Sequence, residues 1–93
     1  MKDNRDFGFR DQIQRATVST MNNIAEGFER SSDTEFKRFL DIAKASCGEV
    51  RSMLYLAEDL EYIGTSEAKE LRSKCCQLSG SIANLMKYLR KNL

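Results

Sequence analysis

The chain has 93 residues, 41% of them hydrophobic and 31% charged, and its 15 basic and 14 acidic side chains leave a formal net charge of +1. This composition predicts a single soluble domain over residues 1–93, and it excludes a membrane protein because no apolar run approaches the roughly 18 residues that cross a bilayer. The absence of histidine excludes the enzymes that rely on a histidine base or on Ser–His and Cys–His pairs.

The first predicted element is a helix over residues 8–28. Residues at helical spacing share one face of it, namely Phe9, Ile13, Ala16, Thr20, Ile24 and Phe28, and Val18, Met21 and Ala25 widen that face. Gly27 is expected to end the helix. The short link from Glu29 to Ser32 makes the next helix an antiparallel neighbour.

The second predicted helix, residues 33–63, is the element on which the others pack. Its steps of three and four form one apolar stripe: Phe36, Leu40, Ala43, Cys47, Val50, Leu54 and Ala57. A second row lies beside it, Phe39, Ile42, Met53, Leu56 and Leu60, so the face is wide enough to contact two helices. Ser32 and Glu35 resemble a capping box, and Gly64 is expected to be the left-handed residue that ends the helix.

A third helix is predicted over residues 66–91, with Thr65 or Ser66 as its cap. Its stripe again follows steps of three and four: Ala68, Leu71, Cys75, Leu78, Ile82, Leu85 and Leu89. The predicted fold is therefore all-α, an antiparallel up-down bundle of three long helices.

The charge is unevenly distributed along the chain. Residues 32–64 carry four basic and seven acidic groups, a net of −3, whereas residues 65–93 carry six basic and two acidic groups, a net of +4. Two interpretations follow: the acidic and basic helices attract each other within the molecule, or the last helix offers a basic face to an anionic partner.

A basic row along the long helix is the candidate nucleic-acid site. Lys37, Lys44 and Arg51 are spaced seven residues apart and so stand in line on one flank. Secondary candidates are Arg10, Arg15, Lys87, Arg90 and Lys91. The partner would be RNA or DNA bound through its phosphates. The alternative is an ordinary solvated surface, and Asp41 and Glu58 add negative charge to the same face.

Small residues form two tracks that would let helix backbones approach closely: Ala45, Gly48 and Ser52 on the second helix, and Ser73, Cys76, Gly80 and Ala83 on the third. A glycine inside a helix costs roughly 1 kcal/mol relative to alanine, so something should offset Gly48 and Gly80. The tracks predict either a tight crossing within the chain or contact with another copy, and together with the wide apolar face they favour a homo-oligomer.

The three cysteines are an odd number in a helical setting, which predicts reduced thiols and a cytoplasmic protein. Cys47 and Cys75 lie on apolar stripes and are expected to be core residues. Cys75 and Cys76 are adjacent and point in different directions, so they are poorly placed for one metal ion. No metal, cofactor or small-molecule substrate is expected.

Several segments of the sequence resemble a bacterial family, the four-helix bundle or 23S rRNA intervening-sequence proteins. The resemblance is carried by Gln14-Arg15-Ala16, by Asn23-Ile24-Ala25-Glu26-Gly27-Phe28, by the run from Glu35 to Ala43, by Leu60-Glu61-Tyr62-Ile63 and by Leu85–Leu93. It covers roughly residues 7–93. The Asn-Ile-Ala-Glu-Gly-Phe run with the following Phe-Xaa-Xaa-Phe-Leu block is fairly specific.

The resemblance implies an up-down four-helix bundle, a ring-like homopentamer and no established enzymatic activity. Related proteins serve as the accessory variability determinant of diversity-generating retroelements, where they contact nucleic acid. Members usually begin with an additional helix before the stretch that corresponds to Phe7. We therefore expect a family bundle lacking its first helix. Met21 also stands where members often have proline.

Asn23 and Glu26 form a polar pair on the flank of the first helix. They are expected either to be exposed to water or to form hydrogen bonds across a helix interface and fix its register. The predicted function is a non-enzymatic, self-associating scaffold or a weak, sequence-independent nucleic-acid accessory. The alternatives are an enzyme with an unrecognised site and a genomic passenger without selected activity.

Overall fold

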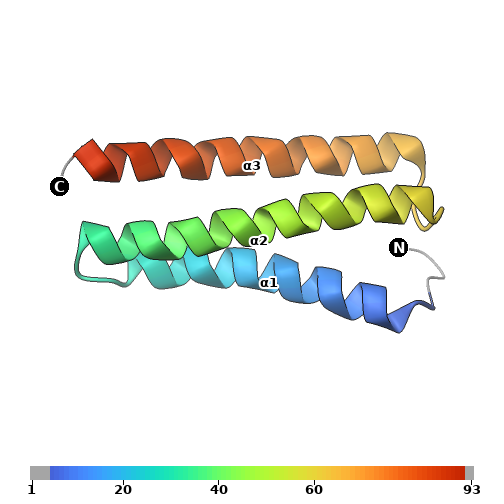
Figure 1. The fold of residues 1–93 in the computed structure, drawn as a ribbon, viewed down its shortest axis with the longest axis horizontal. Helices are drawn as coiled ribbons and strands as arrows, with labels where there is room; N and C mark the ends of the chain where they lie inside the picture. Colours follow the sequence, from blue (N-terminus) through green and yellow to red (C-terminus); the bar gives the residue numbers. More distant parts are fainter. Residues whose placement is uncertain (1–4, 92–93) are drawn as a thin grey trace.

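The computed structural model describes residues 5–91, which form three helices in antiparallel order. They are α1 (Phe7–Phe28), α2 (Asp33–Asp59) and α3 (Thr65–Lys91), and each runs the length of an elongated molecule of 47 × 22 × 13 Å (Figure 1). This arrangement confirms the predicted all-α, up-down bundle.

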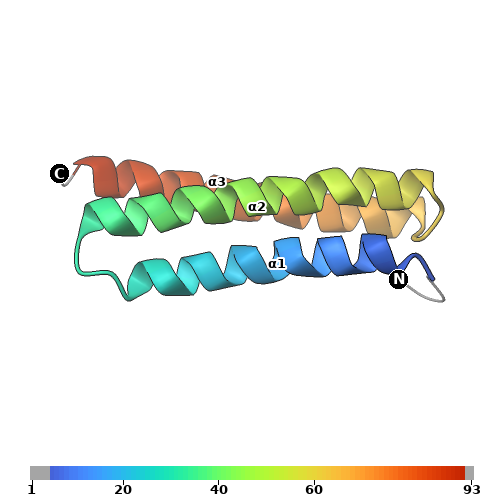
Figure 2. The same cartoon turned by 60° about the horizontal axis from the view of Figure 1, so that its bottom comes forward.

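Helix α2 lies between the other two and packs on both. In the part of the chain that the structure describes, no Cα atom of α1 lies within 8 Å of one in α3. Figure 2 shows α1 apart from α2, with α3 behind α2. The wide apolar face predicted for α2 therefore does contact two helices, and the three helices form an open angle rather than a closed bundle.

The core consists of two clusters that share α2. One joins α1 to α2 through Phe9, Ile13, Leu54 and Ala57, and the other joins α2 to α3 through Leu40, Ala43, Ile82 and Leu89. Leu40, Ala43 and Ala57 are at most 1% exposed, as expected for the central stripe. The second predicted row is more open, because Ile42, Leu56 and Leu60 are all exposed.

Gly27 allows α1 and α2 to approach closely. A Cβ atom at this position would lie 2.7 Å from Cδ1 of Phe36 and 3.3 Å from Cβ of Phe39, and the residue is buried. The predicted end of this helix at residue 28 agrees with the structure, but Gly27 lies inside α1 and has no positive φ, so it does not end the helix. The glycine is needed for helix packing and not for a turn.

Helix α2 ends at Asp59, four residues before the predicted end at residue 63. The N–H of Tyr62 donates to the carbonyl of Ala57 (2.8 Å), and that of Glu61 donates to Glu58 (3.0 Å). These are the two bonds of a Schellman motif, and Glu61 is its left-handed residue, with a φ of 61°. The expectation for Gly64 is therefore wrong, because the described glycines have no positive φ.

The helix starts follow the sequence signals in part. Ser32 caps α2, as predicted, with its hydroxyl accepting a 3.2 Å hydrogen bond from the N–H of Glu35. Helix α3 begins one residue earlier than predicted, at Thr65, and the N–H of Ala68 donates to the carbonyl of Gly64 (3.0 Å). Thr65 lies near Glu58 and contributes to lowering the pKa of that carboxyl group.

Candidate functional site

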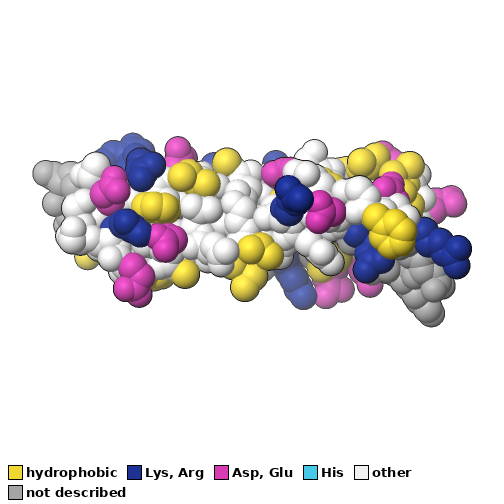
Figure 3. Space-filling view, turned by 90° about the horizontal axis from the view of Figure 1, so that it is seen from below, with side chains coloured by type: hydrophobic (Ala, Val, Ile, Leu, Met, Phe, Trp, Pro, Cys, Tyr) yellow, Lys and Arg dark blue, Asp and Glu magenta, His cyan; other side chains and the backbone are white. Residues whose placement is uncertain are grey.

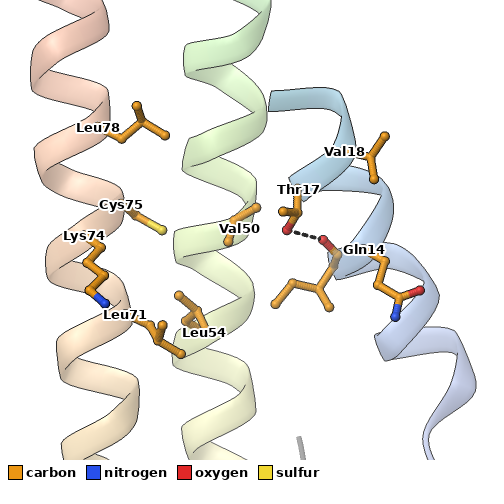
Figure 4. Close-up of a pocket in the computed structure, with 10 residues that line it drawn as sticks. Gln14, Thr17, Val18, Val50, Leu54, Leu71, Lys74, Cys75 and Leu78 are labelled. Atoms are coloured by element: carbon orange, nitrogen blue, oxygen red, sulfur yellow. Dashed lines mark hydrogen bonds between the residues drawn. The ribbon is translucent and has the colours of Figure 1, made fainter. Parts of the chain in front are cut away.

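An apolar groove runs between α1 and α3, with α2 as its floor. It encloses about 630 Å³, and its lining comes from all three helices: Ile13, Gln14, Thr17, Val18, Val50, Leu54, Leu71, Lys74, Cys75 and Leu78. Figure 4 shows α2 between the two walls and Leu71 and Leu78 extending from α3 toward α2. We call this feature the groove. It exists because α1 and α3 each pack on α2 and not on each other.

The walls of the groove leave large apolar side chains in solvent. Leu71 and Leu78 on α3 are 37% and 39% exposed, and Val18 on α1 is 52% exposed. Burial of such surface is favourable by roughly 25 cal/mol per Å², so a groove of this kind is a place where another apolar surface would bind. Its polar lining is limited to Gln14, Thr17 and Lys74, and the Thr17 hydroxyl already donates to the carbonyl of Ile13 (2.8 Å).

The predicted basic row does not line the groove. Lys44 and Arg51 are exposed and Lys37 is half-buried, all on the flank of α2. Nη1 of Arg51 donates to Sγ of Cys76 at 3.3 Å, which places Arg51, the last residue of the row, beside α3. This hydrogen bond, and the negative charge that Cys76 carries once its thiol is deprotonated, raise the pKa of Arg51.

One of the two acidic residues expected to oppose the row is already paired. Arg72 donates to Glu58 (2.6 Å) across α2 and α3, and this hydrogen bond lowers the pKa of Glu58. The Arg72 guanidinium also lies 4.1 Å from the centroid of the Tyr55 ring. Asp41 remains an exposed carboxylate near the row.

The secondary basic candidates are dispersed. Arg15 pairs with Asp11 (3.0 Å) on α1, and the Arg10 guanidinium lies 5.8 Å from the Phe7 ring centroid. Lys87 and Arg90 are exposed on α3, whereas the side chain of Lys91 lies outside the described residues. In Figure 3, which views the molecule from below Figure 1, basic and acidic side chains alternate without forming a patch of one sign.

The small-residue tracks lie at the surface. Gly48 and Ala83 are half-buried, and the remaining members are exposed: Ala45, Ser52, Ser73, Cys76 and Gly80. A Cβ atom added at Gly48 or Gly80 would have no heavy atom within 4 Å, apart from the adjacent residues and the nearby backbone of its own helix. These two glycines therefore do not serve a tight crossing within the chain, and contact with another copy stays a prediction.

Asn23 and Glu26 do not act as one unit within the chain. Nδ2 of Asn23 donates to the carbonyl of Ser19 (2.8 Å) and to its hydroxyl (3.2 Å). The Ser19 and Ser46 hydroxyls share a 2.8 Å hydrogen bond, so Asn23 is linked to α2 through Ser19. Glu26 is exposed and instead pairs with Arg30, which follows the end of α1.

The cysteines differ in environment. Cys47 is only 2% exposed, as predicted for a core residue, and its Sγ donates to the carbonyl of Cys75 (3.4 Å). Cys75 is half-buried, and its pKa is raised mainly by this burial and to a lesser extent by the nearby Cys47 thiol. Cys76 is exposed. Among residues 5–91, no three cysteine or acidic side chains form a group that could hold a metal ion.

The interactions that join distant segments were not predicted, and two of them illustrate the reason. Tyr62 donates to Asp6 (2.6 Å), and Arg72 pairs with Glu58. No fixed spacing in the sequence predicts either interaction, because each depends on how the helices are placed relative to one another. One wall of the groove had a partial signal, since Val18, which widens the apolar face of α1, lines the groove.

None of the three helices, over the residues that the structure describes, carries an apolar stretch long enough to cross a membrane. Residues 1–84 match the family described as 23S rRNA-intervening sequence protein. No curated protein matches the sequence.

Proposed function

The chain belongs to the 23S rRNA-intervening sequence protein family, and from this membership and the groove we propose that it is a non-enzymatic helical scaffold that associates with copies of itself. The observation that carries the proposal is the open apolar groove between α1 and α3. The family is not known for enzymatic activity, and the lining of the groove is suited to packing.

The chemistry of the groove supports this function. Its floor and walls are mostly aliphatic, and its charged group, Lys74, extends from the α3 wall. A long, open and apolar surface is complementary to an amphipathic helix, which binds by inserting a row of side chains. A helical scaffold with such a groove gains stability when another helix covers it.

The mass of the intact chain in solution tests the proposal. We expect light scattering at micromolar concentration to give a multiple of the 10.7 kDa chain mass. Dilution should return the assembly toward single chains, since association depends on protein concentration. A stable single-chain mass over the whole concentration range would contradict self-association.

We propose nucleic-acid binding as a second candidate function, through Lys37, Lys44 and Arg51. The observation that favours it is the position of this row outside the groove, with Arg51 beside α3, together with the pairing of Glu58 by Arg72. A row of three cations is weak on one chain. Repetition of the row on several copies would strengthen contact with a phosphate backbone.

Binding of single-stranded DNA and RNA at several salt concentrations tests this function. Replacement of Lys37, Lys44 and Arg51 by Glu should abolish binding and flatten its dependence on salt. The matched control changes Arg5, Arg38 and Lys69 to Glu, which alters the net charge equally at exposed positions that are not binding candidates. An equal loss of binding in both triple variants would show that the row is not the binding site. An absence of binding by the unmodified protein at low salt would contradict the proposed function.

A further inference from the structure

Two cysteine thiols meet in the contact between α2 and α3. Sγ of Cys47, on α2, donates to the carbonyl of Cys75, on α3, at 3.4 Å. Figure 4 shows the sulfur of Cys75 extending from α3 toward α2. The pKa of Cys75 is raised first by burial and next by the Cys47 thiol, so the two sulfur atoms are near neighbours. The contact therefore brings together one thiol from each helix.

The third cysteine is directed elsewhere. Cys76 follows Cys75 in the same helix, and successive residues of a helix point about 100° apart. Its Sγ lies at the surface, where it accepts a 3.3 Å hydrogen bond from Nη1 of Arg51. Cys47 and Cys75 are therefore the pair that the packing of the helices creates, and Cys76 serves as the comparison.

The pair can be reached from the groove. Cys75 lines the groove together with Leu71 and Leu78, so a small molecule in solvent has access to its side chain. Cys47 is 2% exposed, but it needs no access of its own because it meets Cys75 inside the contact. Residues joined by a disulfide have Cα atoms roughly 4.4–6.8 Å apart. Since the Cys47 thiol already touches the backbone of Cys75, only a small shift is needed for bonding.

We propose that Cys47 and Cys75 form a redox-sensitive lock, which joins α3 to α2 when a low-molecular-weight disulfide oxidises the two thiols. The Cys75 thiolate attacks one sulfur of the small disulfide and releases the other half as a thiolate. The Cys47 thiolate then attacks the sulfur of Cys75 and releases the second half. Two protein thiols and one small disulfide thus become one protein disulfide and two small thiols, and the protons of the protein thiols pass to the released thiolates.

The lock would restrain one wall of the groove and leave the other free. It would join residues 28 positions apart, near the middle of α2 and of α3. Within residues 5–91, α3 makes no close backbone approach to α1, so a link to α2 acts on the α3 wall alone. The raised pKa of Cys75 keeps its thiol protonated at neutral pH, so the pair stays reduced until an oxidant is in excess. This inference does not depend on the proposed self-association.

Oxidation of the Cys76→Ser variant by excess oxidised glutathione tests the pairing. The exposed position of Cys76 makes this change compatible with the fold. We expect mass spectrometry of the peptides to show one intramolecular disulfide between Cys47 and Cys75, and its loss in the variant Cys75→Ser with Cys76→Ser. In the unmodified chain, the same disulfide should form while Cys76 carries at most a glutathione adduct. If no such disulfide forms at any protein concentration, or if Cys47 pairs with Cys76 in the unmodified chain, the lock is wrong.

Hydrogen exchange of the Cys76→Ser variant tests what the disulfide does. Oxidation should slow amide exchange in α3 at least tenfold more than in α1, and a reducing agent should reverse the effect. Equal slowing in both helices, or no change in α3, would contradict a lock on the α3 wall even if the disulfide forms. The mass of the chain in solution, measured separately, decides self-association, so failure of one inference is distinguishable from failure of the other.

Discussion

Asp6 accepts two hydrogen bonds that fix the start of α1 against the turn between α2 and α3. Its Oδ1 accepts from the N–H of Phe9 (3.0 Å), and its Oδ2 accepts from the hydroxyl of Tyr62 (2.6 Å). The Tyr62 ring also packs edge-on against Phe9, with centroids 5.2 Å apart. One carboxylate thus caps a helix and joins residues 56 positions apart.

This contact should make stability depend on pH at both extremes. The hydrogen bond from the Tyr62 hydroxyl, and to a lesser extent that from the Phe9 N–H, lower the pKa of Asp6 below 3.8. The ionised Asp6 therefore stabilises the folded state fully well above pH 3.8. This contribution is lost as pH falls through the lowered pKa of the folded state. The hydrogen bond to Asp6 raises the pKa of Tyr62 above 10.0. The contribution of the protonated Tyr62 to stability is therefore present below pH 10 and is lost as pH rises through the raised pKa.

The measurement is the thermal midpoint of Asp6→Asn and of the unmodified chain at several pH values. We expect Asp6→Asn to lower the midpoint at pH 7, with a difference that shrinks toward pH 3. Asp41→Asn, at an exposed carboxylate in the middle of α2, is the control. A difference that does not change between pH 7 and pH 3 would show that the charge of Asp6 is not what stabilises the contact.

Gly27→Ala should destabilise the fold by about 1–3 kcal/mol, because the added methyl group would overlap the Phe36 ring and force a shift in packing. Gly48→Ala is the matched change in open space and should stabilise a single chain by about 0.5–1 kcal/mol through helix propensity. Chemical denaturation of both variants provides the free energies of unfolding. A stable Gly27→Ala would mean that the close approach of α1 and α2 is not required.

The sequence predicted the helices well and their ends less well. Periodic stripes such as Leu40–Ala43–Cys47 require only that one face be buried, so they identify both the helix and the face. The end of α2 depends on whether Glu61 or Gly64 takes the left-handed conformation, and here the packing of Tyr62 on the Phe9 and Ala57 cluster outweighs the preference for glycine. For Gly27, the neighbour that requires glycine lies on another helix, so the sequence pattern alone suggested a helix end.

The candidate site was only partly predictable for the same reason. The row of Lys37, Lys44 and Arg51 follows from helical spacing, but its position beside Cys76 depends on the packing of α3. The groove depends on the separation of α1 and α3, which no local pattern specifies.

Glu61→Gly should stabilise the fold by about 0.5–1 kcal/mol. The left-handed conformation costs a non-glycine residue about 1–2 kcal/mol, part of which is offset by the greater freedom of glycine in the unfolded chain. Gly64→Ala is the comparison, and it should not destabilise, since Gly64 has no positive φ and a Cβ there meets no atom within 4 Å. Urea unfolding measures both, and a loss of stability in Glu61→Gly would contradict the assigned turn.

The three thiols should react with an alkylating agent in the order Cys76, Cys75, Cys47. Cys76 is exposed, burial raises the pKa of Cys75, and Cys47 is 2% exposed. Mass spectrometry of the peptides after timed labelling gives the order. Cys76→Ser should leave stability nearly unchanged, whereas Cys47→Ala should cost about 1–3 kcal/mol. Labelling of Cys47 before Cys76 would contradict the packing of α2 on α3.

Among residues 5–91, the helices whose Cα atoms approach within 8 Å are α1 with α2 and α2 with α3, so these close approaches join neighbours in the chain. Each helix hairpin can therefore form without waiting for a distant segment, and proteins with such local topology fold in microseconds to milliseconds. The two hairpins share α2, so opening at either outer helix leaves the other hairpin in place. Native-state hydrogen exchange should consequently show the slowest amides in α2, with α1 and α3 exchanging through separate partial openings.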